Sequence, residues 1–361
     1  MERGGYGTRA LATAGGQRPA KGGAIATTSP SIPRPRGPIT AGLIEQLGSK
    51  QPKAVLPDVG SVGEPLADDD LQLALYLCYE LHYRGLEGVS PDLEWSPRLL
   101  KFRSTLEGMM LEALAEEVGP PEPPRGGVGE LVFELVEADE APSLSAYIEV
   151  TASLEEFREF VIHRSAYQLK EADPHSWAIP RLAGAPKAAL VEIQADEYGG
   201  GDPDRVHATL YARTMDALGL DSTYGAYVDR LPGTTLATVN LMSLFGLHRR
   251  GRGAIVGHLA AFEVSSPRPN GRYANGLRRL GFEAPATEFF DEHVEADSVH
   301  ENIAAYDLAG GLASVEPGLA GDILFGIRAL LVLDGRFAEL LLEAWRLDES
   351  SLLAAAPSVR S

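Results

Sequence analysis

The stretch EFFDEHVEADSVHEN, residues 288–302, carries the pattern that indicates how this chain folds. It places His293, Asp297 and His300 at positions i, i+4 and i+7, which share one face of a helix with 3.6 residues per turn. Two imidazoles and a carboxylate on one helical face can bind a metal ion. The pattern therefore predicts a helix with two possible roles, a metal-binding stripe or a solvated acidic face with two incidental histidines.

The charge of this helix is unusual. No Lys or Arg occurs from residue 281 to residue 327, and carboxylates that lie one helical turn apart repel each other. A bound cation on one side of the helix would neutralise this repulsion. The acidic side chains are Glu288, Asp291, Glu292, Glu295, Asp297 and Glu301.

Other residues of metal-ligand type occur upstream. Glu263 follows the small-residue apolar run GHLAAF, and a carboxylate buried there is costly unless it has a partner. Glu171 and Glu197 stand near predicted helix ends, where exposed carboxylates are common, and Asp196 is an alternative to Glu197. His207 has the alternative role of a core histidine.

Taken together, the candidates are four carboxylates and three imidazoles, which exceed what one metal ion can use. Two ions that share bridging carboxylates could use them all. The predicted metal ligands are Glu171, Glu197, His207, Glu263, His293, Asp297 and His300.

The order of these residues resembles that of a known family. Glu171 comes first, followed by the pair Glu197 and His207, then Glu263, and then the HxxxDxxH element at residues 293–300. In this order the chain is similar to the heme-oxygenase-like diiron oxidases and oxygenases, also called iron-containing redox enzymes. The resemblance covers roughly the last two thirds of the chain, from about Ser153 to Trp345. Each element alone is weak, but their combination is specific.

The resemblance implies an all-α, heme-oxygenase-like helical bundle, here with an N-terminal helical extension. It implies two iron ions (Fe2+), with O2, a small-molecule substrate and an external electron donor as partners. The implied substrates are an amino acid, an amine or a fatty acid, and the implied outcomes are N-oxygenation, desaturation or C–C cleavage. Arg164, Tyr167 and Gln168 precede Glu171 by one or two helical turns and are predicted to line the substrate pocket.

Helix signals agree with an all-α fold. Asp68 and Ser96 begin two predicted helices, and Ser153 with Glu156 matches a capping box. Another helix is predicted from about residue 185 to Glu197. The run GGGDPD after it predicts a break, because a straight helix would hold Glu197 and His207 about 15 Å apart along its axis.

Composition suggests three regions. Residues 1–40 are basic and aperiodic and are predicted to be a disordered tail, residues 41–127 an N-terminal helical region and linker, and residues 128–350 the diiron domain. Cys78 lies in an apolar helical run and is predicted to be a buried structural thiol.

The formal net charge of −19 argues against nucleic acid as a partner. No apolar run reaches the length of a membrane span and no secretory signal is evident, so we expect a cytoplasmic enzyme, possibly a homodimer.

Two alternatives remain open on the same pattern. The scaffold also supports metal-free enzymes of the thiaminase-like or cofactorless kind, although seven intact ligand-type residues argue against that interpretation. The chain could also be a non-enzymatic helical protein that binds iron or a partner through its N-terminal helices.

Overall fold

A computed structural model describes residues 29–49, 56–60 and 62–354, apart from the side chains of Asp297 and Ser298. These residues form helices and connecting loops, and none of the described segments is a strand. The predicted all-α class is therefore confirmed. None of the described helices combines the length and the apolar character that crossing a membrane requires.

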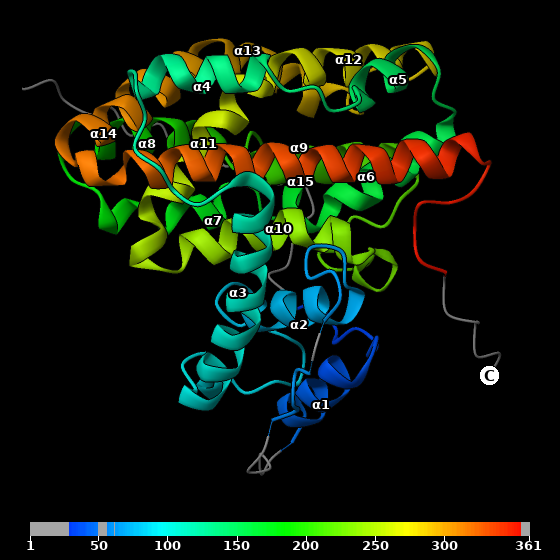
Figure 1. Ribbon diagram of the computed structural model, residues 1–361. Helices are drawn as coiled ribbons and strands as arrows, with labels where there is room; N and C mark the ends of the chain where they lie inside the picture. Colours follow the sequence, from blue (N-terminus) through cyan, green and yellow to red (C-terminus); the bar gives the residue numbers. More distant parts are fainter. Residues whose placement is uncertain (1–28, 50–55, 61, 355–361) are drawn as a thin grey trace, which may run out of the picture.

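The helices lie in layers above an N-terminal projection (Figure 1). The upper layer consists of α4 (Val128–Glu137), α5 (Leu144–Val150), α12 (Pro267–Arg279) and α13 (Glu288–Asn302). Below it lie α6 (Leu154–Gln168), α7 (Asp173–Ser176), α8 (Gly184–Glu197), α9 (His207–Ala217), α10 (Gly233–Gly246), α11 (Arg252–Ser265), α14 (Gly311–Val315) and α15 (Ala320–Arg346). The projection consists of α1 (Pro38–Leu47), α2 (Asp69–Glu80) and α3 (Pro97–Val118).

Short helical segments connect these elements. A π-helical segment, η6 (Ile303–Gly310), continues α13 toward α14. The 3₁₀ turns are η1 (Pro91–Leu93), η2 (Ile179–Arg181), η3 (Gly199–Gly201), η4 (Val228–Arg230), η5 (Arg249–Gly251) and η7 (Pro317–Leu319).

Two of the predicted helix starts are confirmed by their side-chain caps. The side chain of Asp68 accepts a hydrogen bond from the backbone N–H of Leu71 at 2.7 Å at the start of α2. At the start of α6, Ser153 Oγ accepts from the Glu156 N–H at 3.2 Å, and Glu156 accepts from the Ser153 N–H at 2.6 Å. These contacts satisfy N–H groups that have no partner inside the helix.

The predicted break between Glu197 and His207 is also confirmed. Helix α8 ends at Glu197, and α9 begins at His207. Between them Gly199, Gly200 and Gly201 all have positive φ, which glycine adopts without the steric cost that a side chain brings. The break places a carboxylate at the end of one helix and an imidazole at the start of the next.

The N-terminal helices share an apolar core with the bundle. Buried side chains of α1, α2 and α3 belong to the same cluster as those of α10, α11 and α15. Cys78 lies in this core, as predicted, and burial raises the pKa of its thiol to about 12. The helical extension therefore packs as part of the molecule and not as a separate unit on a linker.

The segment predicted as a tail is described only from residue 29 onward, and residues 1–28 lie outside the described part. Helix α1 begins at Pro38, and Ile39 and Thr40 are buried. Their backbone N–H groups donate to Asp70 at 2.8 Å each. Composition did not reveal this helix start, because the carboxylate that caps it lies some 30 residues further along the chain.

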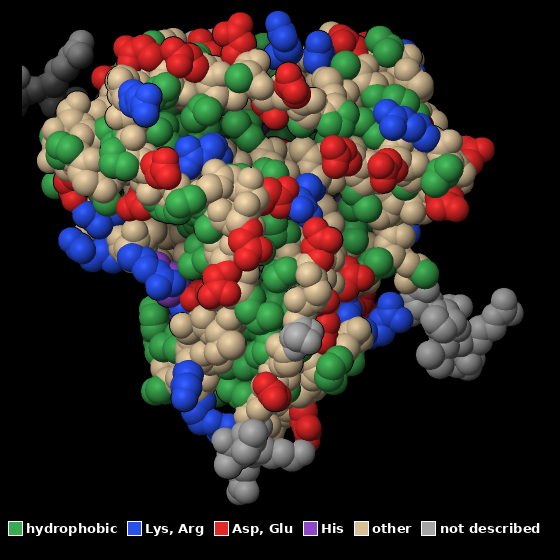
Figure 2. Space-filling model, viewed as in Figure 1, with side chains coloured by type: hydrophobic (Ala, Val, Ile, Leu, Met, Phe, Trp, Pro, Cys, Tyr) green, Lys and Arg blue, Asp and Glu red, His purple; other side chains and the backbone are tan. Residues whose placement is uncertain are grey.

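Figure 2 shows how charge is distributed over one face of the molecule. Carboxylates and cations are interspersed over most of this face, and carboxylates gather along its upper edge, where α4 and α13 lie in Figure 1. Some of the negative charge visible in this view therefore lies in the layer that contains α13.

Helices α11 and α15 cross in close contact. A Cβ atom at Gly326 would overlap the backbone carbonyl of Ala254, and a Cβ atom at Gly257 would overlap that of Ile323. Two glycines thus allow the backbones to touch, and this contact fixes the position of α11, which carries Glu263.

We predict that Gly326→Ala lowers the free energy of unfolding by about 1–3 kcal/mol, because the helices must separate to admit the methyl group. The matched control is Gly108→Ala in α3, where the added Cβ meets no atom within 4 Å. That change should raise stability by roughly 0.5–1 kcal/mol. Urea unfolding of both variants measures the difference, and equal effects would show that the crossing is not tightly packed.

Candidate metal centre

Six of the seven predicted ligand residues meet in the interior of the bundle. The first group consists of Glu171, Glu197, His207 and His293, all of which are buried. His207 Nδ1 lies 2.9 Å from Glu197 Oε2, and His293 Nε2 lies 3.5 Å from Glu171 Oε1. The rings of His207 and His293 are 4.4 Å apart between centroids. This group offers two carboxylates and two imidazoles at one point.

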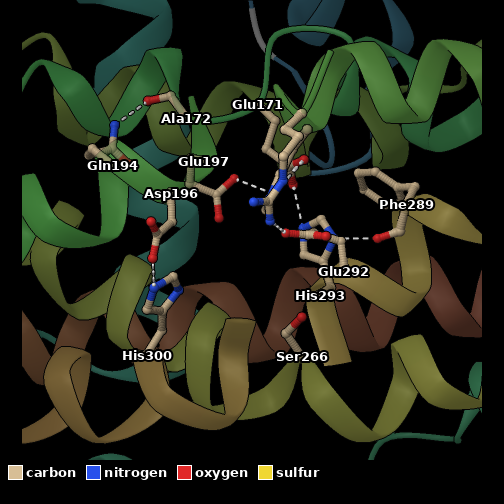
Figure 3. A network of polar contacts seen from close by, with 12 residues as sticks. Glu171, Ala172, Gln194, Asp196, Glu197, Ser266, Phe289, Glu292, His293 and His300 are labelled. Atoms are coloured by element: carbon tan, nitrogen blue, oxygen red, sulfur yellow. Dashed lines mark hydrogen bonds and ion pairs between the residues drawn. The ribbon is translucent and has the colours of Figure 1, made fainter. Parts of the chain in front are cut away.

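A second group adjoins the first. It consists of Glu197, Glu263 and His300, which are also buried, and His300 Nδ1 lies 3.6 Å from Glu263 Oε2. Glu197 belongs to both groups. In Figure 3, Glu197 lies between the pair formed by Glu171 and His293 and the side chain of His300.

The seventh predicted ligand is Asp297. Its backbone lies in α13 between His293 and His300, as the sequence pattern predicted, but its side chain lies outside the described part of the structure. Its role as a ligand remains a prediction.

The histidine rings are oriented by hydrogen bonds. His293 Nδ1 lies 2.7 Å from the carbonyl oxygen of Phe289, one turn earlier in α13. A carbonyl only accepts, so Nδ1 carries the proton and Nε2 is the nitrogen that faces Glu171. His300 Nε2 lies 2.9 Å from Asp196 Oδ2, and its Nδ1 faces Glu263. Metal-binding histidines are commonly held in this way through their second nitrogen.

The carboxylates and imidazoles shift each other's protonation. Burial acts to raise the pKa of Glu197, but the charges of His207, His293 and His300 outweigh burial and lower it to about 2. Burial acts to lower the pKa of His300, but Glu263 and Asp196 outweigh it and raise the pKa to about 9. The pKa of Glu171 is raised, chiefly by burial.

The site fits a metal by its donor set and by its unmet hydrogen-bonding capacity. Glu171 Oε2 is buried and accepts no hydrogen bond from any described residue. A cavity of about 10 Å³ lies among Glu171, Glu197, Glu263 and His293, roughly the room that one water-sized sphere needs. Oxygen and imidazole donors around such a space are a suitable environment for iron.

Glu171 is positioned by a turn that follows α6. The next residue, Ala172, has φ 71°, which is uncommon for a residue other than glycine. Gln194 of α8 donates a hydrogen bond from Nε2 to the Ala172 carbonyl at 2.8 Å (Figure 3). The turn is therefore attached to α8, the helix that ends at Glu197.

The other side of this turn is held by the N-terminal helices. Lys170 Nζ lies 3.1 Å from Glu80 Oε2, and both side chains are at most 1% exposed. The hydroxyl of Tyr224 donates to the same Glu80 oxygen at 2.7 Å. Arg84 donates to the carbonyl of Leu169 at 2.8 Å. The buried ion pair with Glu80 of α2 thus fixes Lys170, the residue next to Glu171.

A larger cavity of about 110 Å³ opens beside Glu171 and His293. Arg164 and Gln168, two of the three residues predicted to line the substrate pocket, line this cavity, whereas Tyr167 lines two smaller cavities next to it. Several lining residues come from segments that the sequence did not connect with the site, among them Asn270, Tyr273 and Asp334.

Two histidines that sequence reasoning left outside the ligand set form a pair nearby. His175 Nε2 lies 3.1 Å from His258 Nδ1, and both rings are buried. Burial lowers the pKa of His175 to about 4 and that of His258 well below its usual value. Both rings are therefore neutral near pH 7.

Sequence reasoning missed three of the residues that support the site. The sequence pattern indicates Asp196 only as an alternative ligand, but it contacts His300. No sequence pattern indicates that Gln194 and Lys170 support the site. The one available signal is proximity, since Lys170 precedes Glu171 and Gln194 stands one turn before Glu197. The partner of Lys170 lies 90 residues away in sequence, and that of Gln194 lies 22 residues away.

Comparison with known proteins gives two findings. A family model described as "Iron-containing redox enzyme" matches residues 158–335. A nitrosourea synthase of Streptomyces achromogenes subsp. streptozoticus is 27% identical over 166 residues, which cover 46% of this chain and 35% of that protein. The chain thus spans about a third of the length of that relative.

We predict that Lys170→Met lowers the free energy of unfolding by about 3–5 kcal/mol, because it leaves the buried carboxylate of Glu80 without its cation. The double variant Glu80→Gln with Lys170→Met should recover most of this loss. Lys101→Met, at an exposed lysine of α3, is the control and should change little. If all three variants unfold at the same urea concentration, the ion pair does not hold the turn.

We also predict that metal binding releases protons. At pH 7 the metal-free site holds His300 protonated, since its pKa is raised to about 9, and a metal can bind only the neutral ring. Metal affinity should therefore rise between pH 6.5 and 8.5. Anaerobic calorimetry with Mn(II) in two buffers of different ionisation enthalpy counts the protons. Asp196→Asn should reduce the count at pH 7.5, because Asp196 helps to raise this pKa. A count of zero in the parent protein would contradict the prediction.

Proposed function

Since the chain belongs to the iron-containing redox enzyme family and has the heme-oxygenase-like all-α fold, we propose that it is a non-heme diiron oxidase or oxygenase. The observation that carries this proposal is the position of Glu197, which belongs to both groups of buried carboxylates and imidazoles. A carboxylate has two oxygens and can bind two metal ions at once.

Glu171, Glu197, His207 and His293 would hold the first ion, and Glu197, Glu263 and His300 would hold the second. Asp297 is a further proposed ligand. When bound, iron in such a site supplies the redox chemistry that O2 activation requires. The chain's own residues supply the surroundings. The carboxylates balance the metal charge, the imidazoles are neutral donors, and Asp196 and the Phe289 carbonyl orient two of the rings.

Burial contributes to the proposed reaction in a second way. Each of the six described ligand residues is at most 7% exposed. A dry site strengthens the electrostatic interactions within it and limits side reactions with water. A small substrate would reach the ligands through the cavity beside Glu171 and His293. O2 and an external electron donor are the other partners that we propose.

The relative indicates a reaction class. A nitrosourea carries an N–N=O group, so a nitrosourea synthase forms a product with oxidised nitrogen. Among N-oxygenation, desaturation and C–C cleavage, we therefore favour N-oxygenation of a small molecule.

A metal-free enzyme on the same scaffold fits the site less well. Three buried glutamates converge there from different segments, and a buried carboxylate without sufficient partners is costly. A protein that only binds iron would use the same ligands, so an experiment must separate it from an oxygenase.

We predict that the anaerobic protein takes up two equivalents of Fe(II). Glu171→Ala and Glu263→Ala should each retain about one equivalent, and Glu197→Ala should lose both, because Glu197 serves both ions. The exposed Glu283→Ala is the control and should bind two. Saturation of the parent protein at one equivalent would refute the diiron proposal.

Exposure of the iron-loaded protein to O2 then separates an enzyme from an iron-binding protein. An oxygenase should show a transient visible absorption that decays, and it should consume O2 faster when its substrate is present. Slow oxidation to a stable ferric state, with no acceleration by any amino acid, amine or fatty acid, would favour simple iron binding.

A further inference from the structure

The cavity of about 110 Å³ beside Glu171 and His293 has an ion pair in its wall. Arg164 of α6 and Asp334 of α15 both line it. Both terminal nitrogens of Arg164 lie 3.2 Å from a single oxygen, Oδ1 of Asp334. Among the described residues, no group donates a hydrogen bond to the other oxygen, Oδ2. The side chains remain 18% and 35% exposed, so both charges can be reached by a ligand.

The pair is held firmly in place. The Arg164 guanidinium packs over the ring of Phe337 at 4.2 Å. Burial acts to lower the pKa of Arg164, but the Asp334 carboxylate outweighs it and raises that pKa. A fixed cation and a fixed anion side by side match a ligand that carries one group of each sign. A ligand with only a carboxylate would face Asp334, and a ligand with only an amine would face Arg164, each at an electrostatic cost.

The rest of the lining limits the size and polarity of the ligand. Gln168 lies one turn after Arg164, and its side-chain oxygen Oε1 is buried with no hydrogen-bond partner in the described part of the chain. Aromatic rings of Phe160, Tyr211 and Phe262 supply apolar surface. A dry protein cavity of about 150 Å³ holds a molecule the size of benzene. A cavity of about 110 Å³ therefore has room for a short chain and cannot enclose a long acyl chain.

We propose that this cavity binds an α-amino acid, with its carboxylate at Arg164, its ammonium group at Asp334 and its side chain directed toward Glu171 and His293. Glu171 lies in the turn that follows α6, and it lines the same cavity as Arg164 and Asp334. A side chain that extends from an amino acid bound at the ion pair therefore lies in the cavity that Glu171 and His293 border. The part of the ligand nearest the proposed iron site is then the side chain and not the α-amino group. This orientation rests on the proposed function, whereas recognition of the two charges does not.

The test is anaerobic calorimetry on the Fe(II)-loaded protein, where ligand binds but is not turned over. The probes are the twenty standard L-amino acids, decanoic acid and hexylamine. For the tightest amino acid, the amine that lacks its carboxylate and the acid that lacks its ammonium group are added. We expect at least one amino acid to bind, and both of its truncated analogues to bind roughly tenfold more weakly or worse.

Two variants assign the charges. Arg164→Gln should weaken binding of the amino acid roughly tenfold or more and leave the amine analogue unchanged or tighter. Asp334→Asn should weaken the amino acid similarly and leave the acid analogue unchanged or tighter. Arg328→Gln, on the same helix as Asp334 but outside the cavity, should bind like the parent.

A further variant protects the test against misfolding. The double change Arg164→Gln with Asp334→Asn removes both charges together and avoids a single unpaired one. It should retain its helical circular dichroism and two irons, and it should lose the preference for amino acids over their analogues. The proposal is overturned if no amino acid binds, if decanoic acid or hexylamine binds more tightly than every amino acid, or if the double variant keeps the preference.

The iron content of each variant keeps the two proposals apart. If the parent binds amino acids but never takes up two irons, the diiron proposal fails while charge recognition stands. If two irons bind and no amino acid does, the substrate assignment fails while the metal centre stands.

Discussion

The structure depends on one electrostatic constraint, the burial of carboxylates and imidazoles from separate segments at a single point. Glu171, Glu197 and Glu263 come from a turn, the end of α8 and the interior of α11, and they face histidines of α9 and α13. Anions brought together away from water disfavour the closed state unless positive charge accompanies them. In the metal-free protein, protonated imidazoles supply part of that charge, and this explains why the pKa of His300 is raised while that of Glu197 is lowered. A pair of divalent ions would supply it more completely.

The backbone features near the site follow from this constraint. A continuous helix cannot present Glu197 and His207 to one small volume, and the three glycines at residues 199–201 provide the break that lets it happen. Helix α13 remains continuous from Glu288 to Asn302, so His293 and His300 lie on one face about two turns apart, and each ring meets a different group of carboxylates. The spacing of the histidines along the helix thus sets the separation of the two proposed metal positions, while Glu197 joins them.

The sequence predicted what local pattern and donor chemistry determine, and it did not predict contacts between distant segments. Caps at Asp68 and Ser153 and the break after Glu197 could be predicted because each depends on residues a few positions apart. Six candidate ligands could be placed together because their side-chain types have few other reasons to be buried. The start of α1 was missed because its cap, Asp70, comes from another helix. Likewise, nothing near Asp334 in the sequence associates it with Arg164, 170 residues earlier.

The part of the chain that matches the family model does not contain everything that positions the proposed ligands. The match begins at residue 158, yet Lys170 pairs with Glu80, the last residue of α2. The Leu169 carbonyl accepts a hydrogen bond from Arg84, which follows α2. These contacts hold the residues just before Glu171, and a buried ion pair tolerates little displacement because each charge depends on the other. The turn is attached on its opposite side to α8 through Gln194. A change in how α2 packs would therefore affect Glu171 before any other proposed ligand, which makes the N-terminal helices part of the scaffold of the proposed metal centre.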